Sequence, residues 1–237
     1  MIDWLLGPLS GAAAHDIAPW AAWHARSMVL AWGVLLPLGA IAARFFKVLP
    51  GQAWPKRLDH KAWWHTHRYT QWAGGAVFGV GLAVVWGHAA GDSQAARWHG
   101  GLGWAVCVAG VVQLAAGLLR GSKGGPTEAS PRGDHYDMTP RRVAFEQLHK
   151  ALGWLALLLA MGVVALGLVL VDAPRWMALG LAAWWASLIA AFVLLQRAGR
   201  CIDTYQAIWG PDRDHPGNQR PPVGWGVHRP HGAWKES

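Results

Sequence analysis

Five long runs without a charged residue constrain this 237-residue chain more than any other feature of its sequence. Each run is about 17 to 23 residues long, the length that an α-helix needs to cross the hydrocarbon core of a bilayer. The runs cover residues 27–43, 69–91, 98–119, 151–171 and 176–196. Charged residues make up only 14% of the chain, against roughly 25% in a soluble domain. The sequence therefore predicts an all-α membrane protein with five transmembrane helices.

The basic residues predict how these helices are oriented. Of the 21 Lys and Arg residues, only Arg26, Arg97 and Arg175 fall on the side of the N-terminus, and the other 18 fall on the opposite side. By the positive-inside rule, we expect the N-terminus outside and the C-terminus in the cytoplasm. The same rule accounts for the net charge of +8, so we expect no nucleic-acid partner. Because no basic n-region opens the chain, we expect no cleaved leader and place the protein in a bacterial inner membrane.

Three regions follow from this reading. Residues 1–18 are expected to form a short extracytoplasmic or interfacial segment, residues 19–197 the transmembrane domain, and residues 198–237 a polar cytoplasmic tail. The tail is too polar and too rich in proline to span a bilayer. The loop 120–142 is rich in glycine, proline and charge, so we expect it to be flexible.

Capping residues predict where the helices begin. Pro19 suits the start of the first helix, and the pair Thr139-Pro140 suits the N-cap and first turn of the fourth. Asp59 could cap the second helix and Ser93 the third.

Four of the twelve histidines occupy the same register in four successive helices: His24, His67, His99 and His149. In an antiparallel bundle, His24 and His99 share the outer half, and His67 and His149 share the inner half. Two neutral imidazoles from facing helices are the axial ligands that a six-coordinate b-type haem requires. The sequence therefore predicts two haem b groups in a bundle of the first four helices, with these histidines as iron ligands, roughly 20–30 Å apart along the membrane normal.

Glycines and cations near these histidines extend the predicted sites. Gly103 and Gly153 each follow a proposed ligand by four residues, so they share its helix face and leave room for a flat macrocycle. Glycines are also common wherever membrane helices pack closely. The cations Arg26 and Arg97 on the outer side, and Arg68, Arg142 and Lys150 on the inner side, could bind haem propionates or anchor the helices at the interface.

Arg44 and Lys47 end the first predicted helix on the inner face. An anionic electron donor could dock there, although cations also favour helix C-termini for electrostatic reasons alone.

Motifs in the first four predicted helices match a known family. The matching residues are His24, Trp32, Gly33, Pro37, Leu38, Gly39, Arg44 and Lys47 in the first helix, Trp63, His67 and Gln71 in the second, His99 and Gly103 in the third, and His149 and Gly153 in the fourth. On these residues the chain resembles the cytochrome b561 family, specifically the core that follows DOMON domains in eukaryotic ferric-reductase-like proteins. The resemblance covers about residues 23–196, with a longer third loop than in the family, and we expect no DOMON domain ahead of the core.

The resemblance implies two b haems, paired as above, and electron transfer between a donor and an acceptor on opposite sides of the membrane. The expected donor and acceptor are small molecules or proteins, with a quinol or an ascorbate-like reductant as a candidate donor. Outer helix faces could pair in a homodimer. A quinol-oxidising cytochrome b subunit of a dehydrogenase complex is an alternative. A haem-free membrane transporter is another alternative. A zinc site built from histidine pairs is a third, but it would need more acidic or thiolate ligands at the same membrane depth than the sequence offers.

Overall fold

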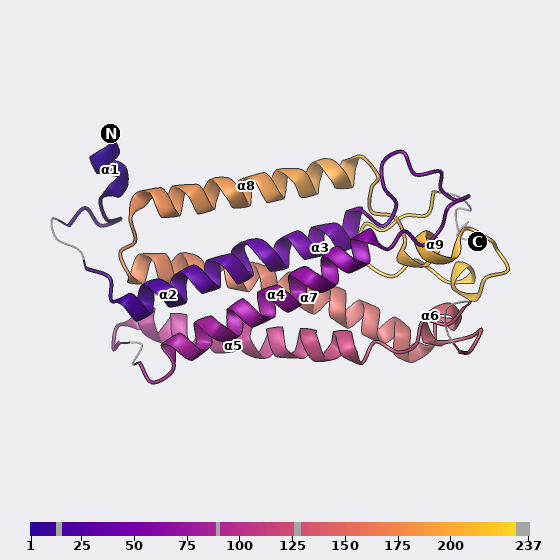
Figure 1. Cartoon of the computed structure of the whole chain (residues 1–237), viewed down its shortest axis with the longest axis horizontal. Helices are drawn as coiled ribbons and strands as arrows, with labels where there is room; N and C mark the ends of the chain where they lie inside the picture. Colours follow the sequence, from indigo (N-terminus) through magenta and orange to yellow (C-terminus); the bar gives the residue numbers. More distant parts are fainter. Residues whose placement is uncertain (13–15, 89–90, 126–128, 231–237) are drawn as a thin grey trace. The chain divides into compact units, whose positions relative to one another are not determined.

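Each of five long helical stretches contains most of one charge-free run (Figure 1). The computed structural model describes residues 1–12, 16–88, 91–125 and 129–230, and the regular structure within these ranges is helical apart from two isolated β-bridges. The long stretches are α2 (Pro19–Met28), which continues through the π-helix η1 (Val29–Leu35) into α3 (Leu36–Phe45), then α4 (Ala62–Val85), α5 (Gln94–Leu118), α7 (Pro140–Leu170) and α8 (Arg175–Arg197). The shorter helices are α1 (Ile2–Leu6), α6 (Asp134–Asp137), α9 (Thr204–Trp209) and the 3-10 helix η2 (Pro216–Gln219).

Four of these stretches are long and apolar enough to cross a membrane: Pro19–Phe45, Gln94–Leu118, Pro140–Leu170 and Arg175–Arg197. The chain is therefore an integral membrane protein. Helix α4 is 24 residues long, but the stretch 65–71 near its N-terminus is polar. The helix is therefore less apolar than the other four and is not one of these candidate spans.

Capping residues start the helices largely as the sequence predicts. Helix α2 begins at Pro19. The Thr139 hydroxyl accepts a hydrogen bond from the backbone N–H of Arg142 at 3.3 Å, at the start of α7. The Ser93 hydroxyl accepts one from Ala96 at 3.1 Å, at the start of α5. These three starts are confirmed.

The predicted cap of α4 by Asp59 is wrong. Its carboxylate binds the Lys123 ammonium instead, and the helix begins three residues later, where the N–H of Ala62 donates to the His60 imidazole at 3.3 Å. The sequence could not reveal this because Lys123 lies 64 residues away.

The first long stretch changes its helix type just before a proline. Pro37 has no N–H, so the carbonyl of Gly33, four residues earlier, loses its helical donor. The indole Nε1 of Trp184 in α8 donates to that carbonyl at 2.8 Å. A side chain from another helix thus satisfies a backbone group that would be costly to leave unpaired in a membrane.

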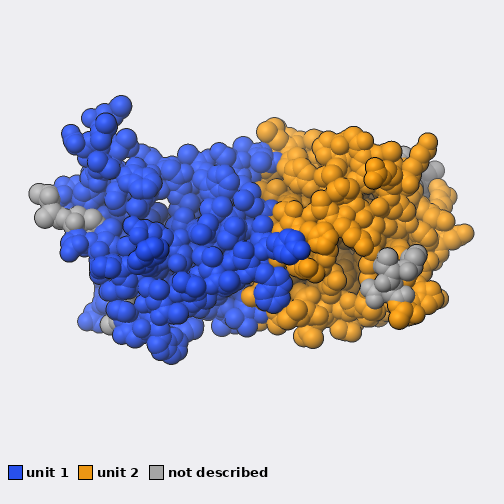
Figure 2. All heavy atoms as spheres, in the orientation of Figure 1, with its two compact units in different colours: residues 1–38, 69–111, 154–191 blue, residues 39–68, 112–153, 192–237 orange. Residues whose placement is uncertain are grey.

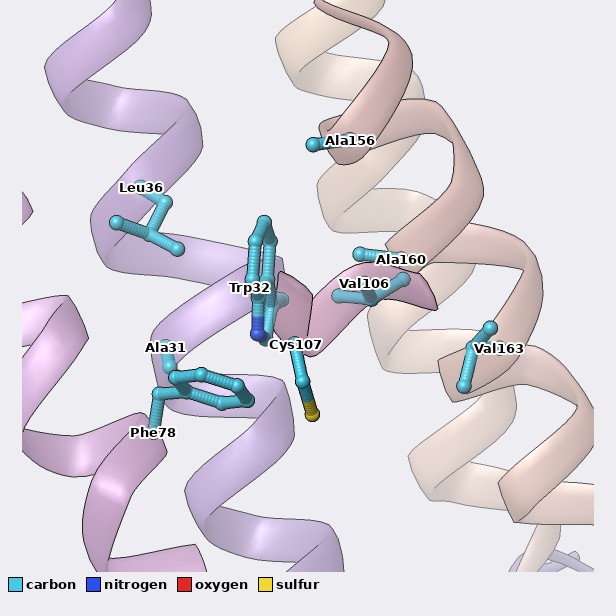
Figure 3. Packing of buried hydrophobic residues seen from close by; sticks show 9 residues of the cluster. All are labelled: Ala31, Trp32, Leu36, Phe78, Val106, Cys107, Ala156, Ala160 and Val163. Atoms are coloured by element: carbon cyan, nitrogen blue, oxygen red, sulfur yellow. The ribbon is translucent and has the colours of Figure 1, made fainter. Parts of the chain in front are cut away.

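The chain divides into two compact units, each built from three separate stretches of sequence (Figure 2). Unit 1 consists of residues 1–38, 69–111 and 154–191, and unit 2 of residues 39–68, 112–153 and 192–237. The core of unit 1 gathers Trp32 from η1, Phe78 from α4, Cys107 from α5 and Ala160 from α7 (Figure 3). The rings of Trp32 and Phe78 meet edge to face, with centroids 5.6 Å apart.

Unit 2 contains the folded C-terminal tail. Tyr205 of the tail is 2% exposed, packs against Met138 and Val223, and its hydroxyl donates to the carbonyl of Tyr136 at 2.8 Å. The described parts of the third loop, which the sequence predicts to be flexible, and of the tail, which it predicts to be polar, contribute side chains to one core. Residues 13–15 and 231–237 of the predicted terminal segments lie outside the described residues.

Two glycines of α4 provide a matched test of helix packing in unit 1. A Cβ at Gly81 would lie 2.7 Å from Met28 Cε and 2.9 Å from Ser27 Cβ, whereas a Cβ at Gly79 would have no neighbouring atom within 4 Å. We expect Gly81→Ala to lower the free energy of unfolding by about 1–3 kcal/mol through overpacking. Gly79→Ala is expected to be neutral or slightly stabilising. Unfolding in detergent measures both, and equal losses would contradict this packing.

Two histidine pairs as candidate metal centres

The first histidine pair lies within unit 1 and joins α2 to α5. The ring centroids of His24 and His99 are 6.2 Å apart, and the ring planes meet at 79°. The Nδ1 atom of His24 is 3.0 Å from the carbonyl of Gly81, and that of His99 is 3.1 Å from the carbonyl of Val163. A Cβ at Gly167, one turn after Val163, would lie 2.9 Å from His99 Cε1, so this glycine leaves room for the ring.

The second pair lies within unit 2 and joins α4 to α7. The ring centroids of His67 and His149 are 6.3 Å apart, with an interplanar angle of 83°. The Nδ1 atom of His67 is 3.1 Å from the carbonyl of Gly39. The ring of His149 stacks on Phe145 at 5.2 Å, and its carbonyl accepts from Gln113 at 2.8 Å. Each unit thus brings together one of the two predicted pairs.

The hydrogen bonds determine which ring nitrogen is free in three of the four histidines. A carbonyl can only accept, so Nδ1 must carry the proton in His24, His67 and His99. The lone pair then lies on Nε2, the nitrogen that remains for a ligand, and metal-bound histidines are usually oriented by such a bond from the other nitrogen. His149 differs, because its Nδ1 is buried and finds no hydrogen-bond partner in the described part of the chain.

The spacing of both pairs suits one metal ion between the rings. Imidazole nitrogens bind a metal at about 2 Å, so two rings on opposite sides of one ion have centres about 6 Å apart. No group of three or more His, Cys, Asp or Glu side chains within the described ranges could hold a metal ion. Two imidazoles without further protein ligands fit the axial positions of a haem, whose macrocycle supplies the other donors.

The two glycines predicted to flank the macrocycles differ in their surroundings. A Cβ at Gly103 would have no neighbouring atom within 4 Å, although the residue is only half-exposed. A Cβ at Gly153 would lie 3.3 Å from the Nε2 atom of Gln113. Open space therefore exists beside Gly103, whereas Gly153 permits close approach of the glutamine that bonds to His149.

Three of the predicted propionate-binding cations are exposed and another is half-buried. Arg26 is exposed and lies over the ring of Trp23 at 5.3 Å. Arg97 is exposed and donates to the Gln94 side chain at 2.8 Å and to a backbone carbonyl. Arg68 is exposed. Lys150 is half-buried and forms an ion pair with Glu146.

A buried carboxylate neutralises the cations beside the second pair. Glu146 is 5% exposed and accepts from Arg142 at 3.0 Å and from Lys150 at 2.7 Å. The imidazole Nε2 of His135 lies 3.7 Å from the same carboxylate. Arg142 and Lys150 therefore serve Glu146, one turn before His149, in addition to any role toward a bound group.

The C-terminal tail covers the cations at the end of α3. Lys47 is 6% exposed, and its ammonium donates to the carbonyls of Arg44 at 3.1 Å and Ile202 at 3.0 Å. Burial, followed by the charge of Lys150, lowers the pKa of Lys47 to about 8. In this structure Lys47 is therefore not a surface docking site for an anionic donor.

Sequence reasoning missed several residues that shape these sites. Gln113 is a polar amide within an apolar stretch of α5, which is a signal that the sequence offers. Glu146 offers none, because its spacing to Arg142 and Lys150 is that of ordinary helix pairs. His135 and Gly167 gave no such signal, because their importance depends on contacts with distant residues.

Two curated proteins are similar to the chain in sequence. The chain is 30% identical over 157 residues to a cytochrome b561, DM13 and DOMON domain-containing protein of Arabidopsis thaliana, covering 66% of the chain and 15% of that protein. It is 28% identical over 146 residues to ferric-chelate reductase 1 of Bos taurus, covering 61% of the chain and 22% of that protein. The chain is similar to cytochrome b561-type proteins. It spans less than a quarter of the length of these relatives, and no family model and no solved structure matches it.

The buried imidazole of His135 makes the stability of unit 2 depend on pH. Burial, followed by the charge of Arg142, lowers its pKa to about 3. The unfolded chain therefore binds more protons than the folded one between about pH 6.5 and pH 3, and stability falls as the pH drops through this window, by at most about 1.4 kcal/mol per pH unit. Lys123 and Lys150 also oppose protonation, whereas Glu146 favours it.

We expect His135→Gln to reduce the slope of unfolding free energy against pH between pH 6.5 and pH 4, measured by denaturation in detergent. His228→Gln, at an exposed position in the tail, is the control and should leave the slope unchanged. Parallel slopes for His135→Gln and the unmodified protein would contradict this assignment.

Proposed function

We propose that the chain is a di-haem b-type cytochrome that passes electrons between a donor on one side of the membrane and an acceptor on the other. The observation that carries the proposal is the presence of two histidine pairs with ring centroids 6.2 and 6.3 Å apart. When bound, each haem b would supply an iron that takes up and releases a single electron. Similarity to cytochrome b561-type proteins supports this function.

The histidines would hold the two groups pairwise, His24 with His99 and His67 with His149. Hydrogen bonds from Nδ1 to helix carbonyls orient three of the rings and keep Nε2 available as the ligand. The open space beside Gly103 would admit part of a macrocycle. Arg26, Arg97, Arg68 and Lys150 would lie near propionates, with Lys150 shared with Glu146.

We also propose α4 as a fifth membrane span. Its 24 residues rise about 36 Å at 1.5 Å per residue, enough to cross the hydrocarbon core. Its polar first turns contain His67, which pairs with α7. With five spans, the bias of basic residues would put the N-terminus outside and the C-terminus in the cytoplasm. Residues 1–18 would then form the extracytoplasmic segment, residues 19–197 the transmembrane domain and residues 198–237 the cytoplasmic tail.

The residues near the two histidine pairs would keep water away from the bound haems. In unit 1 the carbonyl that His99 bonds belongs to Val163, a member of the buried apolar core around Trp32 and Phe78 (Figure 3). In unit 2 the buried Glu146 offsets part of the positive charge near His149. The name of the bovine relative suggests a ferric chelate as the acceptor, and a quinol or an ascorbate-like reductant would be the donor.

The test of this proposal is a haem count with ligand variants. We expect two b-type haems per chain in a pyridine haemochrome assay of protein expressed with adequate haem. His24→Ala or His99→Ala should remove one haem, and His67→Ala or His149→Ala the other, because a single remaining imidazole cannot complete six-coordinate binding. The reduced-minus-oxidised spectrum should lose about half its α-band in each case.

His65→Ala is the matched control, since His65 is exposed on the same helix as His67 and lies two residues away. It should retain both haems. One haem in the unmodified protein would contradict a transmembrane conduit, and a colourless protein would favour the haem-free transporter.

A further inference from the structure

A short segment of the C-terminal tail, residues 223–226, lies against the end of a membrane-spanning helix. We call it the tail strap. Its Trp225 is 74% exposed, yet the indole is nearly parallel to the ring of Phe192, at an interplanar angle of 5° and a centroid distance of 6.4 Å. Phe192 belongs to α8, one of the four candidate spans. We propose that the tail strap inserts Trp225 into the interfacial region of the bilayer and anchors the tail there.

The depth of Phe192 supports a lipid environment for the tryptophan. Phe192 precedes the last residue of α8, Arg197, by five positions, which corresponds to about 7.5 Å along the helix axis. Ile189, which lies one turn before Phe192 on the same side of α8, is 57% exposed, and only 6% of the most apolar stretch of α8 is buried inside the protein. Most of the surface of α8 therefore faces lipid, and the indole of Trp225 lies against the ring of Phe192 on this helix.

The backbone of the tail strap is satisfied in the way that a membrane interface requires. The carbonyl of Val223 accepts from Lys150 at 2.8 Å, that of Trp225 from Arg44 at 2.8 Å, and that of Gly226 from Gln196 at 2.8 Å. Carbonyls without a donor are costly where water is scarce. Three donors from three different helices thus let an irregular segment lie at the edge of the hydrocarbon.

The side chains around Trp225 also match an interfacial position. The guanidinium of Arg44 lies 5.1 Å from the centroid of Phe192 and 5.4 Å from that of Trp225. Trp is enriched at membrane interfaces, where its ring is apolar and its N–H remains near water. Gly224 and Gly226 adopt positive φ values of 115° and 64°, which permits the turn that presents the indole outward.

The first experiment measures the environment of position 225 by spin-label accessibility in phosphatidylcholine nanodiscs. Trp225→Cys, Ile189→Cys and Gln219→Cys are labelled in a chain in which Cys107 and Cys201 are replaced by alanine. Ile189 is an exposed residue of α8 and Gln219 an exposed residue of the tail. We expect the ratio of oxygen to nickel-chelate accessibility at position 225 to lie near that of position 189 and several-fold above that of position 219.

The second experiment keeps the tryptophan and so does not depend on the folding of the cysteine variant. Nanodiscs containing a phosphatidylcholine with a diazirine near the start of its acyl chain are irradiated, and labelled peptides are identified by mass spectrometry. The peptide containing the tail strap should be labelled in the unmodified protein and in Trp225→Phe, and several-fold less in Trp225→Ser.

Two results would overturn the proposal. High nickel-chelate accessibility at position 225 together with an unlabelled tail strap would mean that Trp225 faces water. Low accessibility to both reagents, again without lipid label, would mean that protein covers it instead.

Discussion

The hydrogen bonds from histidine Nδ1 atoms to helix carbonyls are the interaction on which both candidate sites depend. Lipid provides no hydrophobic force that drives membrane helices together, so close packing and polar contacts must hold them. His24 bonds to the carbonyl of Gly81, and the missing side chain of the same glycine lets Ser27 and Met28 approach α4. His99 bonds one turn before Gly167, which makes room for its ring. Ligand orientation and helix packing are therefore produced by the same few positions.

The sequence predicts the helices and the histidine register because both depend on local pattern. Apolar runs of membrane length require no knowledge of the rest of the fold, and Ser93 and Thr139 act as caps within four residues of their partners. The pairing of His24 with His99 followed from antiparallel topology alone. The acceptors of the Nδ1 atoms were not predictable, because Gly81 and Val163 lie 57 and 64 residues from their histidines.

The same limit explains the differences at the cations. From sequence alone, Arg142 and Lys150 are free to bind an anion, since their spacing to Glu146 indicates only ordinary helix pairs. The structure buries that carboxylate at 5% exposure, where an unpaired charge would be costly, and two cations together offset one anion. Arg142, Lys150 and Glu146 together carry a net charge of +1 beside His149. A tail that folds over them could not be inferred from a composition rich in proline and glycine.

Lys47 shows why the tail is ordered despite that composition. Its ammonium donates to the carbonyl of Arg44, near the C-terminus of α3, where helices leave carbonyls without donors. The same ammonium donates to Ile202 of the tail. A single buried cation therefore caps a membrane helix and fixes the start of the tail, and Lys150 and Arg44 fix the tail strap by the same chemistry. Arg44, Lys47 and Lys150 thus donate to backbone carbonyls of the tail, which is a structural use of basic residues that charge counting does not reveal.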